Sequence, residues 1–258
     1  MHLDTNERKN MSEQFHSRAA YVSGASRGIG MAVSLKLASL GYNLSLTCRK
    51  NTDKLEELAH SLERDYGVTV ITSTGDVGDY SFMEDVASRS LEKFHHIDTV
   101  VNNAGISYIG LLTDMSPQDW DKVIRTDLSS VFYSSKLFLP DMIREKYGRI
   151  VNISSMWGRV GASMETAYSA AKGGVNALTM ALAKETAPSN VQINAIACGV
   201  IDTDMNRCFS EEERESLIGD IPAGRMASPL EVADLVASVL QSPTYMTGQV
   251  IGIDGGYL

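Results

Sequence analysis

The sequence has few cysteines, and none is placed for a disulfide framework or a zinc site. Only three occur, Cys48, Cys198 and Cys208, and they are widely spaced, odd in number and without a C-x-x-C pair. Disulfide scaffolds and structural zinc sites require paired or closely spaced thiols. We therefore expect no metal site and a reducing, cytoplasmic location.

The chain also lacks long apolar runs and an excess of positive charge. No stretch is apolar enough to span a membrane, and residues 1–17 are too polar for a signal peptide. The net charge of -9 argues against nucleic-acid binding, because clustered lysines and arginines hold a phosphate backbone. We expect neither a membrane nor a nucleic-acid partner, and a disordered polar tail over residues 1–17.

What is present is the composition of an ordinary globular protein, with 43% apolar and 21% charged residues over 258 positions. Strand-like and helix-like segments alternate, which predicts an α/β domain over residues 18–258 whose parallel sheet has helices on both faces. Strands are expected at 18–23, 42–47, 68–73, 98–101, 150–153, 191–197 and 249–253. Helices are expected at 31–40, 53–66, 82–94, 119–146 with an interruption near Pro140, 165–187, 202–219 and 229–240.

A glycine-rich turn follows the first expected strand. Gly24, Gly28 and Gly30 form the pattern G-x-x-x-G-x-G, which runs directly into a helix. Glycines there allow a tight turn and let the backbone approach a pyrophosphate at the positive helix N-terminus. A flexible loop is the alternative, but the strand before and the helix after favour dinucleotide binding.

The end of the second expected strand indicates which nicotinamide cofactor is bound. It has the sequence Thr47-Cys48-Arg49-Lys50 and contains no acid. Enzymes that prefer NAD usually have a carboxylate there, which would repel the 2′-phosphate of NADP. With Arg27 and Arg49 available, the sequence favours NADP(H). The alternative is that both arginines are simply solvated.

Ser155, Tyr168 and Lys172 are the candidate catalytic residues. Tyr168 and Lys172 are four residues apart in an expected helix, so their side chains share one face. A neighbouring ammonium favours the phenolate, which lowers the pKa of tyrosine from its usual value of ~10. Ser155 follows a buried strand at its carboxyl end, where α/β sheets bind ligands. Such an arrangement suits the reduction of a carbonyl group, although a lone Y-x-x-x-K pair also occurs by chance.

Together these motifs resemble those of the short-chain dehydrogenases/reductases. The matching segments occur in order across residues 18–258: 23–30 (SGASRGIG), 75–77 (GDV), 102–105 (NNAG), Ser155, 168–172 (YSAAK) and 247–256 (TGQVIGIDGG). The resemblance implies a Rossmann-type, doubly wound sheet of seven parallel strands, usually in a homotetramer or homodimer. It also implies hydride transfer between a nicotinamide and a carbonyl or alcohol, with Tyr168 as proton donor and Ser155 holding the oxygen.

The resemblance further implies a set of cofactor contacts. They come from the glycine turn, the ends of several strands and the loop after the sixth strand. The residues are Gly24, Ser26, Arg27, Gly28, Ile29, Gly30, Arg49, Asp76, Val77, Asn103, Ala104, Gly105, Tyr168, Lys172, Gly199, Val200 and Thr203.

The chain departs from the family pattern at Asp127 and Cys198, and mildly at Ser23, where threonine is commoner. Asp127 stands where the family has an asparagine, whose backbone carbonyl holds a water that bridges to the lysine, so we count it with the catalytic residues. Its carboxylate would add negative charge near Lys172 and raise the pKa values of Lys172 and Tyr168. Cys198 replaces the family's usual proline, either as an inert small residue, which is favoured, or as a redox-sensitive thiol.

Overall, the chain most resembles bacterial 3-oxoacyl-acyl-carrier-protein reductases of fatty-acid biosynthesis, which implies acyl carrier protein as a partner. Those reductases dock the acidic carrier on basic residues. Here Lys146 matches one such position and Ser189 occupies the other. A net charge of -9 opposes the docking of an acidic partner unless a local basic patch compensates.

Two alternatives remain open. Segments 154–158 (SSMWG) and 161–165 (GASME) resemble a branch that reduces an aminopentanone group on elongation factor P, where Glu165 meets the amine. The alternative for Glu165 is that its negative charge stabilises the N-terminus of the following helix. Trp157 and Met205 are expected along the substrate pocket, unless Trp157 fills a core gap. A catalytically silent NADPH-binding or scaffold protein is disfavoured, because all three candidate catalytic residues are present.

Overall fold

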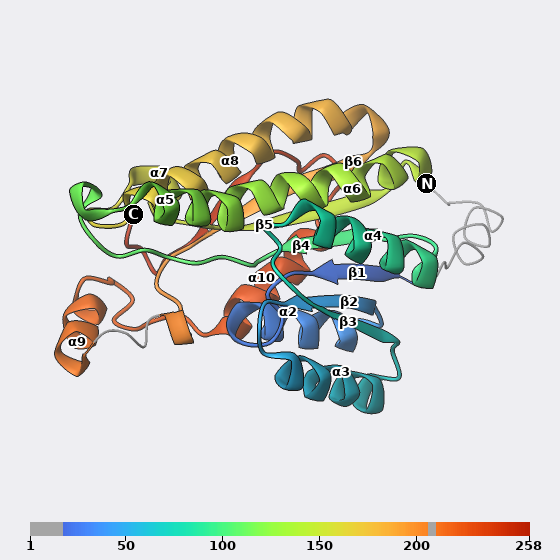
Figure 1. Ribbon diagram of the computed structural model, residues 1–258, viewed down its shortest axis with the longest axis horizontal. Helices are drawn as coiled ribbons and strands as arrows, with labels where there is room; N and C mark the ends of the chain where they lie inside the picture. The colour runs from blue at the N-terminus through green and yellow to red at the C-terminus, as the bar shows by residue number, and fades with distance from the viewer. Residues whose placement is uncertain (1–17, 206–209) are drawn as a thin grey trace, which may run out of the picture.

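Among the residues that the structure describes, 18–205 and 210–258, seven parallel strands form one sheet (Figure 1). The protein is described here by a computed structural model. The strand order is β3-β2-β1-β4-β5-β6-β7. The strands are β1 (Ala19–Val22), β2 (Asn43–Cys48), β3 (Val70–Thr74), β4 (Thr99–Asn102), β5 (Gly148–Ser155), β6 (Val191–Cys198) and β7 (Val250–Ile253). The predicted tail, residues 1–17, and Cys208 lie outside the described residues.

The central strands are buried along their whole length, as parallel strands between two helical layers must be. Every residue of β1, β5 and β6 is buried. The strand order reverses between β1 and β4, which are neighbours in the sheet although β2 and β3 separate them in sequence. Such a switch point leaves a crevice at the carboxyl ends of the strands, where ligands bind in folds of this kind.

Helices cover both faces of the sheet (Figure 1). One layer contains α2 (Gly28–Ser39), α3 (Thr52–Tyr66) and α10 (Pro229–Leu240), whose apolar residues share one core cluster. The other contains α4 (Tyr80–Phe94), α6 (Ser130–Glu145) and α8 (Thr166–Thr186), which share a second cluster. Shorter helices are α5 (Pro117–Ile124), α7 (Trp157–Val160) and α9 (Glu211–Gly219). This architecture confirms the predicted Rossmann-type sheet.

The long helix expected over 119–146 is interrupted at a different place from the predicted one. A π-helical turn, η2 (Arg125–Ser129), separates α5 from α6, whereas Pro140 lies inside α6. A π turn adds a residue to the helical repeat and is frequent at functional sites. The interruption therefore contains Asp127, which the sequence analysis counted with the candidate catalytic residues.

The helix expected over 202–219 is also shorter in the described residues. It begins at Glu211, and the Ser210 hydroxyl accepts a hydrogen bond from the backbone amide of Glu213. The Glu213 carboxylate in turn accepts a hydrogen bond from the Ser210 amide, which completes a capping box and fixes the start of α9. No helix within 18–205 and 210–258 combines the length and apolar character that crossing a bilayer requires.

Candidate active site

A cavity of about 590 Å³ opens at the carboxyl ends of the strands. It is lined by the glycine turn after β1, the ends of β2, β4, β5 and β6, and the first turns of α8. Nearly all predicted site residues line it: Gly24, Ser26, Arg27, Gly28, Ile29, Arg49, Asp76, Val77, Asn103, Ala104, Gly105, Ser155, Trp157, Glu165, Tyr168, Lys172, Gly199, Val200, Thr203 and Met205. Gly30 and Asp127 lie behind the lining.

Contacts between the residues that follow β1 and those that follow β4 hold the glycine turn in position. The Ser23 hydroxyl accepts hydrogen bonds from the backbone amides of Asn103 (2.9 Å) and Ala104 (3.0 Å). The Asn103 side-chain amide donates to the carbonyls of Ser23 (2.9 Å) and Gly24 (3.2 Å). A Cβ on Gly30 would lie 2.3 Å from the Gly24 carbonyl oxygen, so the turn admits no side chain there. Ser23 was not among the predicted site residues.

Two arginines in the cavity are paired with carboxylates from distant segments. Arg27 lies 3.2 Å from the Asp204 carboxylate, and Arg49 lies 3.2 Å from that of Asp76. The sequence argument considered only the end of β2, which contains no acid, whereas these carboxylates follow β6 and β3. Both pairs are partly exposed, so each contributes little to stability and can exchange partners readily.

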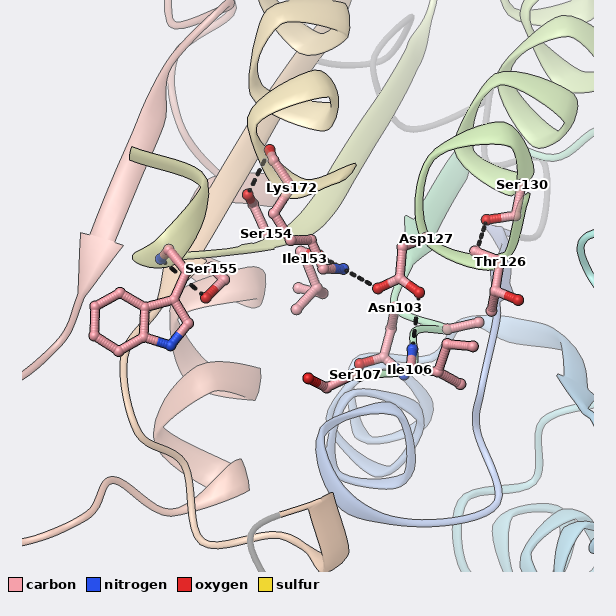
Figure 2. Close-up of polar contacts among 12 residues, drawn as sticks. Asn103, Ile106, Ser107, Thr126, Asp127, Ser130, Ile153, Ser154, Ser155 and Lys172 are labelled. Atoms are coloured by element: carbon pink, nitrogen blue, oxygen red, sulfur yellow. Dashed lines mark hydrogen bonds and ion pairs between the residues drawn. The ribbon is translucent and has the colours of Figure 1, made fainter. Parts of the chain in front are cut away.

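Ser155, Tyr168 and Lys172 face one another across the cavity. Ser155 ends β5, and its hydroxyl accepts a hydrogen bond from the Trp157 amide at 3.2 Å (Figure 2). Tyr168 and Lys172 lie one turn apart on α8, with the lysine Nζ 5.5 Å from the centre of the tyrosine ring. Lys172 also donates a hydrogen bond of 3.0 Å to the carbonyl of Ile153. The structure thus brings the three residues together as the motif spacing predicts.

The pKa of the Tyr168 phenol is raised, not lowered. Burial is the largest cause, and the negative charge of Asp127 adds to it, while the Ser155 hydroxyl acts in the opposite direction. The expectation that Lys172 lowers the pKa of Tyr168 in this chain is therefore wrong. Sequence spacing shows the neighbouring ammonium but not the surrounding core, which disfavours the charged form more strongly.

Asp127 approaches Lys172 from the π turn and is fully buried. One carboxylate oxygen, Oδ1, accepts a hydrogen bond of 2.8 Å from the amide of Ile106 (Figure 2). The other, Oδ2, lies 3.4 Å from the Lys172 ammonium and has no hydrogen-bond partner among the described residues. Burial raises the pKa of Asp127 to about 6, although Lys172 lowers it. The carboxylate lies beside the lysine, as the sequence predicts.

The predicted substrate residues also line the cavity. Glu165 precedes α8 but does not cap it with its side chain; instead its carboxylate accepts a hydrogen bond of 2.7 Å from the Ser107 hydroxyl. Trp157 both lines the cavity and packs edge to face on Tyr257. Met205 also lines the cavity and is 46% exposed. Ser107 and Tyr257 had no sequence signal, because each contact joins distant segments.

Cys198 pairs in register with Ser155 and also lines the cavity. Burial raises the pKa of its thiol to about 12, although Lys172 acts in the opposite direction. A thiol that remains protonated is a poor nucleophile and a poor redox sensor. This favours the inert interpretation of Cys198. Among the described residues, no three histidine, cysteine, aspartate or glutamate side chains gather closely enough to hold a metal ion.

Comparisons with known proteins agree with this geometry. The family model described as short chain dehydrogenase matches residues 18–214. The uncharacterized oxidoreductase YmfI of Bacillus subtilis is 38% identical over 242 residues, which cover 93% of this chain and 99% of the relative. The 3-oxoacyl-[acyl-carrier-protein] reductase FabG of Thermotoga maritima is 37% identical over 246 residues, with 94% and 98% covered.

A solved structure is similar over the same extent. A crystal structure of a variant of actinorhodin polyketide ketoreductase with NADPH superposes with a TM-score of 0.88. The two chains are 30% identical, and the match covers 93% of this chain and 97% of the other.

Proposed function

This chain belongs to the short-chain dehydrogenase family and is an oxidoreductase, and from that premise we propose that it is an NADPH-dependent ketoreductase. The observation that supports this most strongly is the position of Ser155, Tyr168 and Lys172 around one cavity that the glycine turn also lines. The similar structure with NADPH and the relative named a 3-oxoacyl reductase support the same class of reaction.

The residues of the cavity fit a dinucleotide phosphate. The turn at residues 24–30 lines the cavity at the start of α2, where helix N-terminal amides can bind a pyrophosphate. Gly30 allows this turn, because a Cβ there would lie 2.3 Å from the Gly24 carbonyl oxygen. Arg27 and Arg49 supply positive charge at the edge of the cavity, where a 2′-phosphate can replace their present carboxylate partners. We therefore propose NADP(H) as the cofactor.

In this proposal, NADPH supplies the hydride that the carbonyl carbon receives. The Ser155 hydroxyl donates a hydrogen bond to the carbonyl oxygen and holds it beside Tyr168. Tyr168 then gives its phenolic proton to that oxygen, and its raised pKa keeps the proton in place until the negative charge develops. The Lys172 ammonium is held by its hydrogen bond to the Ile153 carbonyl, one helical turn from Tyr168 on α8.

The substrate that we propose first is a 3-oxoacyl thioester on acyl carrier protein, by analogy with the FabG relatives. The docking positions named above, Lys146 and Ser189, lie at the other end of the sheet from Ser155. Lys146 comes just before β5, which Ser155 ends, and its carbonyl accepts a hydrogen bond from Asn190, the residue after Ser189. The eight residues of β5 separate the two ends by roughly 25 Å. A carrier docked there would serve the cavity of another subunit.

An oligomer is therefore part of the proposal. Phe132 on α6 and Met180 on α8 are 48% and 44% exposed, which is high for large apolar side chains on helices that lie side by side. Apolar surface of this kind suits a contact with a second copy of the chain. We propose a cytoplasmic homotetramer or homodimer.

A second candidate substrate carries an amine, such as the aminopentanone group on elongation factor P. The observation that favours it is the Glu165 carboxylate, which lines the cavity close to Tyr168 and is held by the neutral Ser107 hydroxyl. No lysine or arginine among the described residues forms an ion pair with it. A substrate ammonium would supply the missing positive charge.

The deciding experiment compares NADPH consumption with three ketones: acetoacetyl carrier protein, aminopentanone-modified elongation factor P and the generic ester ethyl acetoacetate. We expect turnover of the generic ester, which Tyr168→Phe abolishes, and a large preference for one of the two proteins. Binding of NADPH without turnover of any ketone would instead indicate a catalytically silent protein and would contradict the proposal.

A further inference from the structure

We propose that Asp127 controls proton transfer by Tyr168 through its ion pair with Lys172, whose charge it neutralises inside the site. This inference rests on the proposed ketoreductase function and adds a role that follows from this chain's own carboxylate. Asp127 acts through Lys172 and Tyr168, so it is a positioning residue for charge and does not touch the substrate.

The position of the carboxylate is fixed on all sides. The π turn directs Asp127 into the protein, and the Ile106 amide holds Oδ1 at 2.8 Å. Gly105 covers the opposite oxygen so closely that a Cβ there would lie 2.7 Å from Oδ2. The Lys172 ammonium, at 3.4 Å, is therefore the group that balances the charge on Oδ2 (Figure 2).

Apart from the Lys172 ammonium and the Ser155 hydroxyl, the groups around this pair raise the pKa of the phenol. From η2, Asp127 faces Lys172 and Tyr168 on α8. The loop after β4 contributes the Ile106 amide and the close approach of Gly105. Cys198 on β6 and Glu165 before α8 face Tyr168, and both disfavour its ionisation. An uncompensated ammonium would favour the phenolate, but a carboxylate at ion-pair distance cancels most of that effect.

The consequence is a shift in the pH dependence of both directions of the reaction. In reduction, hydride adds to the carbonyl carbon while Tyr168 gives its proton to the oxygen, and the resulting phenolate regains a proton from solvent. Oxidation of the alcohol runs the same step backwards and requires the phenolate. Both pH-rate profiles therefore change slope at the pKa of Tyr168, and the charge of residue 127 shifts that pKa.

The test compares the protein with Asp127→Asn, which keeps the shape of the side chain and removes its charge. Rates of ethyl acetoacetate reduction and of ethyl 3-hydroxybutyrate oxidation are measured from about pH 6 to about pH 10.5, across the usual tyrosine range. We expect the break in both profiles to move to lower pH by about one unit or more in the variant. Asp127→Ser, which is smaller and also neutral, should move it in the same direction.

Asp98→Asn is the matched control. Asp98 is also a buried aspartate with a raised pKa, but it accepts hydrogen bonds from the Ala19 amide and the Thr99 hydroxyl at the other end of the sheet. We expect its profile to match that of the unmodified protein. Coincident breaks for Asp127→Asn, Asp127→Ser and the unmodified protein would overturn the inference. An unmodified protein that reduces no ketone would instead refute the proposed function.

Discussion

The rings of Trp157 and Tyr257 meet edge to face, with their centroids 5.7 Å apart and their planes at 87°. Trp157 begins α7 and lines the cavity, whereas Tyr257 is the penultimate residue of the chain. The same C-terminal segment contacts the loop before α10, where the Ala223 amide donates to the Gly255 carbonyl at 3.0 Å. The C-terminal segment therefore supports the part of the cavity that Trp157 lines.

Removal of the Tyr257 ring should weaken the binding of the ketone and not of the cofactor. An aromatic pair contributes ~0.5–1.5 kcal/mol beyond its buried area, so we expect Tyr257→Ala to raise KM for the ketone about 2- to 12-fold. The affinity for NADPH, measured by fluorescence titration, should be unchanged. Tyr245→Ala is the control, because Tyr245 is fully exposed. An equal loss of NADPH affinity in Tyr257→Ala would contradict this role.

Much of the site could be predicted because its residues are local to single strands and helices. The glycine turn, Ser155 at the end of β5 and the helical spacing of Tyr168 and Lys172 each depend on one segment. Alternating strands and helices with right-handed crossovers then place the carboxyl ends of all strands at one edge. That rule brings Ser155 and the glycine turn together without further information.

The remaining features depend on distant contacts or on burial by the whole core. The partners of Arg49 and Arg27, which are Asp76 and Asp204, follow different strands. The direction of the pKa shift at Tyr168 depends on how completely neighbouring elements exclude water. Sequence spacing cannot show either. The π turn at Asp127 was missed as well, because Pro140 offered a stronger local signal for an interruption.

Arg49 should determine the preference for NADPH over NADH. A hydrogen bond to a charged group contributes ~1.5–3 kcal/mol, and release from Asp76 offsets part of this, so we expect Arg49→Ala to weaken NADPH binding about tenfold. The affinity for NADH should stay the same, since it lacks the 2′-phosphate. Arg64→Ala, which removes an exposed arginine elsewhere, is the control for net charge. Parallel losses for both cofactors would show that Arg49 does not distinguish them.

The glycine turn can be tested at Gly30 without removing a polar group. A Cβ at this position would lie 2.3 Å from the Gly24 carbonyl oxygen and 2.6 Å from the Asn103 side-chain nitrogen. The turn must move to admit it, so Gly30→Ala should reduce affinity for NADPH at least about tenfold. Gly219→Ala is the control, since a Cβ there meets no atom within 4 Å. Unchanged affinity in a Gly30→Ala protein that melts cooperatively would rule out this site for the cofactor.

The buried carboxyl of Asp127 should also make stability depend on pH. Its pKa is raised from 3.8 to about 6 in the folded protein, so the folded state binds this proton more tightly than the unfolded state. The resulting stabilisation is complete below pH ~4 and is lost as pH rises through ~6. Asparagine does not titrate, so the free energy of unfolding of the unmodified protein relative to Asp127→Asn should fall by roughly 2–3 kcal/mol between pH 4 and pH 7.

Urea denaturation of both proteins at several pH values measures this difference directly, provided that the slope with urea is the same for each. The sign of the pH dependence is the decisive observation, since Asp127→Asn also removes the partner of Lys172 and so changes stability at every pH. A difference that is constant with pH would mean that the Asp127 carboxyl keeps an ordinary pKa, and one that grows in favour of the unmodified protein as pH rises would mean that this pKa is lowered. In that case its charge would be well compensated, and the ion pair with Lys172 would be stronger than burial allows.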